Sequence, residues 1–151
     1  MKELKIFKPN ILIQNRLSSC WCDNIKTLED KIPISQFLKN KGIYALEIEP
    51  IKDHKEWYCF ALPVNKNWDA ETIKENTKLC FSIYNESSFN LTVEFETPEN
   101  KKVGRETLEI DEIGDWNDFS IDVPTGKIRI VLFSGSSATP TYVIKDIVLK
   151  Y

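Results

Sequence analysis

Carboxylates are plentiful and histidine is scarce, and the candidate nucleophiles and general bases form no recognised catalytic pattern. The single histidine, His54, lies in a charged segment that predicts a solvated loop. No Gly-x-Ser-x-Gly motif is present, and the Ser-Gly-Ser-Ser run at 134–137 predicts a flexible loop. The acids Asp111, Glu112 and Asp115 are typical of solvated loop positions. A Cys–His pair and a two-carboxylate hydrolase stay open, because catalytic partners meet in space rather than in sequence. We nevertheless expect that the protein is not an enzyme.

The four cysteines, Cys20, Cys22, Cys59 and Cys80, do not have the spacing of a metal site. Cys20 and Cys22 are separated by a single residue, which is too few for a zinc knuckle, and no second close pair of Cys or His completes a site. Two alternatives remain. The cysteines are unpaired, partly buried thiols in a reducing compartment, or Cys59 and Cys80 form a disulfide.

Aromatic residues make up 11% of the chain and include four tryptophans, which is generous for 151 residues. A flat aromatic ring can cover the apolar C–H face of a pyranose, and carboxylate, amide or guanidinium groups can bond its hydroxyls. Trp57 and Tyr84 are therefore candidate platforms, and Glu94 and Arg129 are candidate partners for hydroxyls. These residues favour carbohydrate binding. The alternative is that each tryptophan fills the core or lies at a sheet edge.

The remaining tryptophans differ in their surroundings. Trp21 and Trp68 lie near predicted loops, and we expect them to be exposed at the rim of a binding surface. Trp68 alternatively closes the core over the turn at Asp69. Trp116 precedes a predicted strand beside polar neighbours, and we expect it to be structural and to cap the fold.

Composition argues against several classes of protein. The net charge is only −3 at pH 7, whereas nucleic-acid-binding proteins usually have a clear basic excess. The short basic cluster of Lys101, Lys102 and Arg105 is expected at a hairpin tip. No stretch approaches the ~20 apolar residues of a membrane span. The charged segment 1–9 is unlike a signal peptide, so the localisation stays open: extracellular if a leader was removed, otherwise cytoplasmic or virion-associated.

Most of the chain shows the period-two alternation of half-buried β-strands. Predicted strands cover residues 11–13, 43–48, 57–62, 79–84, 91–96, 119–123, 128–133 and 142–149. One helical turn is expected over 69–74, with Asp69 as its N-cap. About nine short strands with little helix predict an all-β fold, a jelly-roll β-sandwich of two antiparallel sheets. The length suits a single domain over residues 1–151.

The alternation also assigns the faces of the strands. Leu79, Phe81 and Ile83 alternate with Tyr84, and Leu91, Val93 and Phe95 alternate with Glu94. We therefore expect Trp57, Tyr84, Glu94 and Arg129 to share one outer sheet surface.

Four segments, taken in order, resemble a known family. They are Gly42-Ile43-Tyr44-Ala45-Leu46-Glu47-Ile48, Trp57-Tyr58-Cys59-Phe60, Trp116-Asn117-Asp118-Phe119-Ser120-Ile121 and Tyr142-Val143-Ile144-Lys145-Asp146-Ile147-Val148-Leu149. Over roughly residues 40 to 150 the chain is similar to the galactose-binding-domain-like jelly rolls that serve as carbohydrate-binding modules. The resemblance implies lectin-like, non-catalytic polysaccharide binding, often in association with a glycoside hydrolase.

The same resemblance implies a structural Ca²⁺, with Asp146 of the terminal strand as a ligand. Lys145 stands where the family has the first of two paired acids, so only one of the pair is present. The scaffold also serves protein partners, because a fold does not fix a function. A protein–protein interaction or assembly domain is therefore the alternative to carbohydrate binding.

Overall fold

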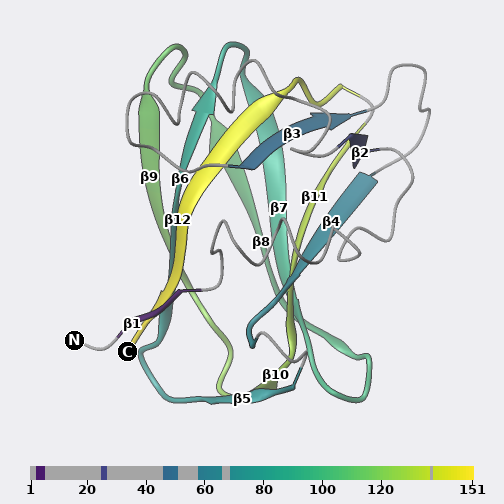
Figure 1. Cartoon of the computed structure of the whole chain (residues 1–151), viewed down its shortest axis with the longest axis vertical. Coiled ribbons are helices and arrows are strands. Elements are labelled where there is room, and N and C mark those ends of the chain that lie inside the picture. Colours follow the sequence, from purple (N-terminus) through teal and green to yellow (C-terminus); the bar gives the residue numbers. More distant parts are fainter. Residues whose placement is uncertain (1–2, 6–24, 27–45, 51–57, 66–68, 137) are drawn as a thin grey trace.

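The computed structural model describes residues 3–5, 25–26, 46–50, 58–65, 69–136 and 138–151. These residues form twelve strands and no helix, and all the strand pairings among them are antiparallel (Figure 1). In these ranges no helix has the length and hydropathy needed to cross a membrane. The predicted all-β sandwich is confirmed.

The larger of the two main sheets has six strands, with the C-terminal strand near its centre. In order across the sheet they are β2 (Ile25–Lys26), β3 (Leu46–Pro50), β12 (Tyr142–Lys150), β6 (Lys78–Asn85) and β9 (Trp116–Asp122), and β1 (Glu3–Lys5) also pairs with β12. The register of β12 on β6 shifts between Lys145 and Val148, where Asp146 has a positive φ of 54°. This bulge turns Ile147 into the core, where it is fully buried.

The second main sheet has four strands and faces the first. Its order is β4 (Tyr58–Pro63), β11 (Ile130–Gly135), β7 (Phe89–Glu96) and β8 (Lys102–Ile110), so β8 is an edge strand. A short ribbon of β5 (Glu71–Ile73) and β10 (Gly126–Ile128) lies across one end of the sandwich, at the bottom of Figure 1.

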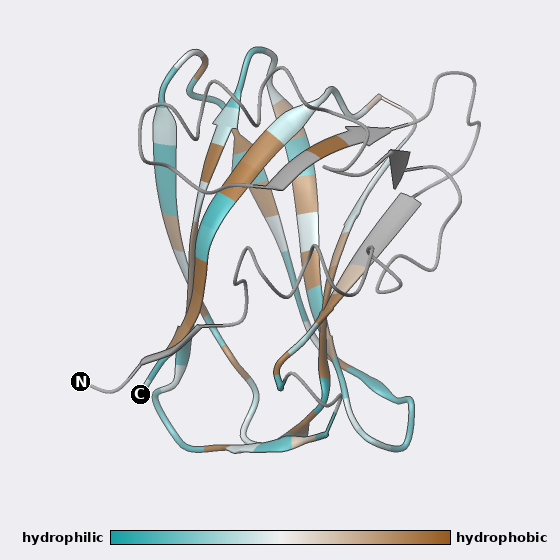
Figure 2. Ribbon diagram, viewed as in Figure 1, coloured by the Kyte–Doolittle hydropathy of each residue, from teal (hydrophilic) through white to brown (hydrophobic). Residues whose placement is uncertain are grey.

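The core lies between the two main sheets and consists of alternate residues of their strands. Figure 2 shows the apolar positions recurring along β6, β7, β11 and β12. The Phe81 ring of β6 meets the Phe133 ring of β11 edge-on, with centroids 5.6 Å apart and planes at 90°. Leu91 and Val93 of β7 are fully buried in the same cluster. The contact between Phe81 and Phe133 shows that side chains of the two sheets interdigitate.

Three local predictions are wrong. The segment expected as a helical turn is extended, because Glu71–Ile73 pairs with Gly126–Ile128 as a strand instead. The strand expected over 128–133 is divided at Arg129, which lies between β10 and β11. The basic cluster is not confined to a hairpin tip, since Lys102 and Arg105 belong to β8. The tip is the turn before it, where the Thr97 amide donates to the Lys101 carbonyl oxygen at 2.9 Å.

Candidate functional site

The residues predicted to form one binding surface do not share a sheet. Tyr84 lies on β6 of the six-stranded sheet, and Glu94 lies on β7 of the four-stranded sheet. The expectation of a common surface for these two residues is therefore wrong, because strand alternation assigns a face but not a sheet. Trp57, Trp21 and Trp68 lie outside the described residues.

Tyr84 belongs to a small cluster on the outer face of the six-stranded sheet. Its ring packs against Trp116 with centroids 5.7 Å apart, and both rings cover the buried Val143. The ammonium of Lys145 lies 4.0 Å from the centroid of the Trp116 ring. Trp116 is the first residue of β9 and is half-buried. Tyr84 and Trp116 are thus half-buried rings that already pack against other side chains of the chain.

Arg129 also has partners within the chain. Its guanidinium donates to the Glu96 carboxylate at 3.2 Å and to the Asn100 side-chain oxygen at 2.8 Å. Glu96 is only 4% exposed, so its carboxylate is largely removed from water, whereas the Arg129 side chain is 28% exposed. Arg129 therefore joins β7, the following turn and the start of β11 into one network.

Glu94 lines a groove on the outer face of the four-stranded sheet. The groove has a volume of about 580 Å³. Its lining consists of polar side chains around one buried leucine, and the residues are Asn90, Thr92, Glu94, Lys102, Arg105, Leu132, Ser134, Gly135 and Ser136. They come from β7, β8 and β11, which are neighbours in the sheet, and from the residue that follows β11. Leu132 is 3% exposed.

The groove continues toward the end of the sandwich into a second hollow of about 460 Å³. The two share Asn90 and Ser136, so they form one continuous surface. The second hollow adds Glu109 and Asp111 along one side and Thr139 on the other. From Ser88, the residue before β7, to Glu94 the extended chain spans about 20 Å at ~3.4 Å per residue. This length suits an extended ligand better than a compact one.

The side chains of the groove match the chemistry of hydroxylated ligands. Amide, hydroxyl, carboxylate and guanidinium groups lie side by side and can both donate and accept hydrogen bonds. The hydroxyl oxygens of Thr92 and Thr107 are 3.0 Å apart across β7 and β8. No described residue of the 580 Å³ groove is aromatic, so an aromatic platform would have to come from outside the described residues.

Sequence reasoning identified Glu94 but missed the other groove residues. Asn90 and Thr92 precede Glu94 at intervals of two on the same strand, and Ser134 lies opposite Thr92 on β11. The spacing along β7 was visible in the sequence. The neighbouring position of β11 was not, because it depends on pairing between strands distant in the chain.

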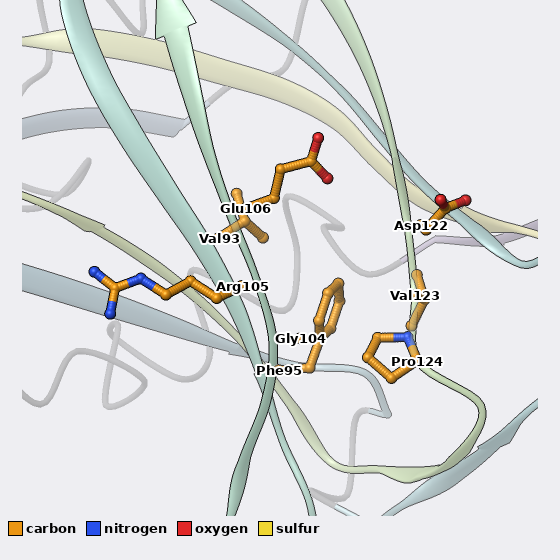
Figure 3. Close-up of a pocket in the computed structure, with 8 residues that line it drawn as sticks. All are labelled: Val93, Phe95, Gly104, Arg105, Glu106, Asp122, Val123 and Pro124. Carbon is orange, nitrogen blue, oxygen red and sulfur yellow. The ribbon is translucent and has the colours of Figure 1, made fainter.

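A smaller cleft of about 280 Å³ lies beside the edge strand β8, where the two sheets face each other. Figure 3 shows the Phe95 ring directed toward Val123 and Pro124, whereas the Arg105 side chain leaves on the other side of β8. Gly104 has a positive φ of 63° there, and a Cβ on it would be 2.6 Å from the Cγ of Pro124. Apolar groups dominate the interior of this cleft, so it fits a hydroxylated ligand less well than the groove.

Asp146, the predicted calcium ligand, is exposed at the β12 bulge. In the described ranges, no group of three or more His, Cys, Asp or Glu side chains is close enough to hold a metal ion. The acidic ligands that a structural Ca²⁺ usually recruits therefore do not surround Asp146 in that part of the chain. Calcium binding stays a prediction.

Comparison with known proteins identifies structures of similar fold. No family model matches the sequence, and no curated protein matches it. A family 30 carbohydrate-binding module superposes with a TM-score of 0.68 at 16% identity, over 99% of this chain and 88% of that one. Another family 30 module gives 0.65 at 18% identity, over 99% of both chains. A family 29 module complexed with cellulohexaose gives 0.59 at 16% identity, over 97% of this chain and 89% of the other.

These similarities cover nearly the whole chain, and they agree with the two facing antiparallel sheets. At such low identity they show the architecture alone. The chain has the β-sandwich fold of the carbohydrate-binding modules of families 29 and 30.

Proposed function

We propose that the chain is a non-catalytic carbohydrate-binding module that holds a polysaccharide along the groove of its four-stranded sheet. The observation that carries the proposal is the groove itself. It is long and polar, and the side chains of Glu94 and Arg105, two of its three charged residues, form no hydrogen bond or ion pair with another described residue. Such groups can bond ligand hydroxyls without first breaking contacts within the protein.

The fold neighbours add support of a different kind. One of them is a family 29 module complexed with cellulohexaose, a linear oligosaccharide. A linear glycan fits a groove that follows a strand for about 20 Å at ~3.4 Å per residue. Trp57, Trp21 and Trp68 remain the proposed source of an aromatic platform. Association with a glycoside hydrolase remains a further proposal.

The test is calorimetry and affinity electrophoresis against a panel of soluble and insoluble polysaccharides. We expect binding to at least one linear glycan. Ser134→Arg, which places a long side chain on the groove floor, should abolish that binding. Ser120→Arg is the matched control, since Ser120 is an exposed serine on β9 of the other sheet. Absence of binding to every glycan, or equal binding by both variants, would contradict the proposal.

A further inference from the structure

The strand β8 is a long and open sheet edge. It has nine residues and pairs with β7 on one side only, with no described strand on its other side. Lys102, Arg105, Glu106, Thr107 and Glu109 are all exposed. An edge of this kind presents unpaired backbone N–H and C=O groups to any strand that approaches it.

The charges on the outer face of β8 are ordered along the strand. Lys102, Arg105 and Glu109 lie opposite Glu96, Glu94 and Asn90 of β7, so they share the outer face of the sheet. The two positive residues come first, the negative one comes last, and Thr107 lies between Arg105 and Glu109. Asp111 follows directly after the strand and extends the negative end. The charge on the outer face of β8 thus changes from positive before Thr107 to negative after it.

A reversal of charge about one residue makes a strand complementary to an antiparallel copy of itself. We propose that β8 pairs antiparallel with β8 of a second copy of this chain. The two copies are related by a two-fold axis that runs perpendicular to the sheet and passes between their Thr107 residues. Arg105 of each copy then lies opposite Glu109 of the other, and Thr107 lies opposite Thr107. The interface is isologous, so each charged contact occurs twice.

The β-bulge at Gly104 is compatible with this pairing of β8 with β8 of the second copy. The pairing of β8 with β7 shifts by one residue between Glu94 and Phe95, and Gly104 is the extra residue. Beyond this bulge, Val103 comes opposite Ile110 of the second copy and Lys102 comes opposite Asp111. A parallel pairing of the two edges in register would instead place Arg105 beside Arg105, which is repulsive. The charge order therefore selects the antiparallel arrangement.

The residues of the central pairs are available for contacts between copies. In the described part of the chain, Arg105, Glu109 and Asp111 form no ion pair. Because the axis is perpendicular to the sheet, the outer faces of both copies point the same way. The dimer would then have one continuous eight-stranded sheet with two grooves side by side on one face.

The first test is the association of the full chain, measured by sedimentation equilibrium over a wide dilution series. We expect a monomer–dimer equilibrium that weakens with salt. Arg105→Glu and Glu109→Arg should each weaken dimerisation by about tenfold or more, because the dimer of either variant contains two like-charge pairs across the axis. The double variant with both changes exchanges the charges and should restore it. A wild-type chain that stays monomeric, or a double variant as weak as the single ones, would overturn the proposal.

A cross-link tests the register independently of charge. Opposite residues in an antiparallel pair have Cα atoms about 4.5–5.5 Å apart, which is within disulfide range. Oxidised Thr107→Cys should therefore give a covalent dimer, beyond any formed by the parent chain under the same treatment. Glu106→Cys is the control, because that residue points to the other face and lies opposite Leu108 of the second copy. Equal cross-linking at the two positions would refute this register.

Discussion

Glu94 on β7 lies directly opposite Arg105 on β8, yet neither forms an ion pair with any described residue. Opposite charges at facing strand positions ordinarily stabilise a sheet by about 0.2–1 kcal/mol. In this chain the two groups instead line a polar groove. Glu94 is therefore available to a ligand that has several hydroxyl groups, and Arg105 is available either to such a ligand or, in the proposed dimer, to Glu109 of the second copy.

The carboxylate of Glu94 should matter for ligand binding more than for folding. Glu94→Gln keeps the shape of the side chain and removes its charge, so we expect glycan affinity to fall about five- to twentyfold while stability changes by less than about 0.5 kcal/mol. Isothermal titration calorimetry and urea unfolding measure the two quantities. Glu75→Gln, at an exposed turn outside the groove, is the control and should change neither. A loss of stability in place of affinity would make Glu94 a structural residue.

For the ion pair of Arg129 with Glu96 we expect the opposite outcome, a loss of stability without a loss of glycan affinity. Arg129→Met removes the guanidinium and leaves a carboxylate that is 4% exposed without its cation. We expect the free energy of unfolding to fall by about 2–3 kcal/mol, because an uncompensated buried charge is costly. Glycan affinity of the folded protein should stay unchanged, as calorimetry below the unfolding transition would show. Unchanged stability with lost binding would instead support the sequence-based prediction that Arg129 bonds ligand hydroxyls.

Gly104 is the position on β8 where only glycine fits. Its φ of 63° is unfavourable for other residues, and a Cβ there would lie 2.6 Å from the Cγ of Pro124. Gly104→Ala should therefore destabilise the chain by about 1–3 kcal/mol. Gly114→Ala is a matched control with a positive φ of 77° but nothing within 4 Å of the added Cβ. Equal losses in urea unfolding would show that backbone strain alone, and not the contact with Pro124, sets the cost.

Sequence reasoning predicted the fold well because alternation is a local property. The inward set of β6, with Leu79, Phe81 and Ile83, is buried as its spacing predicts. The same logic failed at residues 69–74, where an N-cap residue and a polar run suggested a helical turn. Pairing with Gly126–Ile128 overrides that local preference. Long-range pairing also determines which strands are neighbours, and therefore which outward-facing residues share a surface.

The candidate site was predictable only in part, for the same reason. Glu94 was identified from its outward position, and the structure places it in the groove. Tyr84 was identified by the same rule but lies on the other sheet. Period two separates inner from outer positions on each strand, whereas strand order decides which outer residues meet. Strand order arises from contacts between distant residues, and a single sequence gives no direct sign of them.

The aromatic cluster on the six-stranded sheet allows a decisive comparison between the two outer faces. Trp116 packs on Tyr84 and Val143 beneath the Lys145 ammonium, so Trp116→Ala should lower the free energy of unfolding by about 1–3 kcal/mol. Glycan binding should be unaffected, because the cluster and the groove belong to different sheets. Tryptophan fluorescence during urea unfolding would be confounded by the lost indole, so circular dichroism is the better measure of stability. Loss of glycan binding at unchanged stability would place the ligand on this face, and it would contradict the assignment to the groove of the four-stranded sheet.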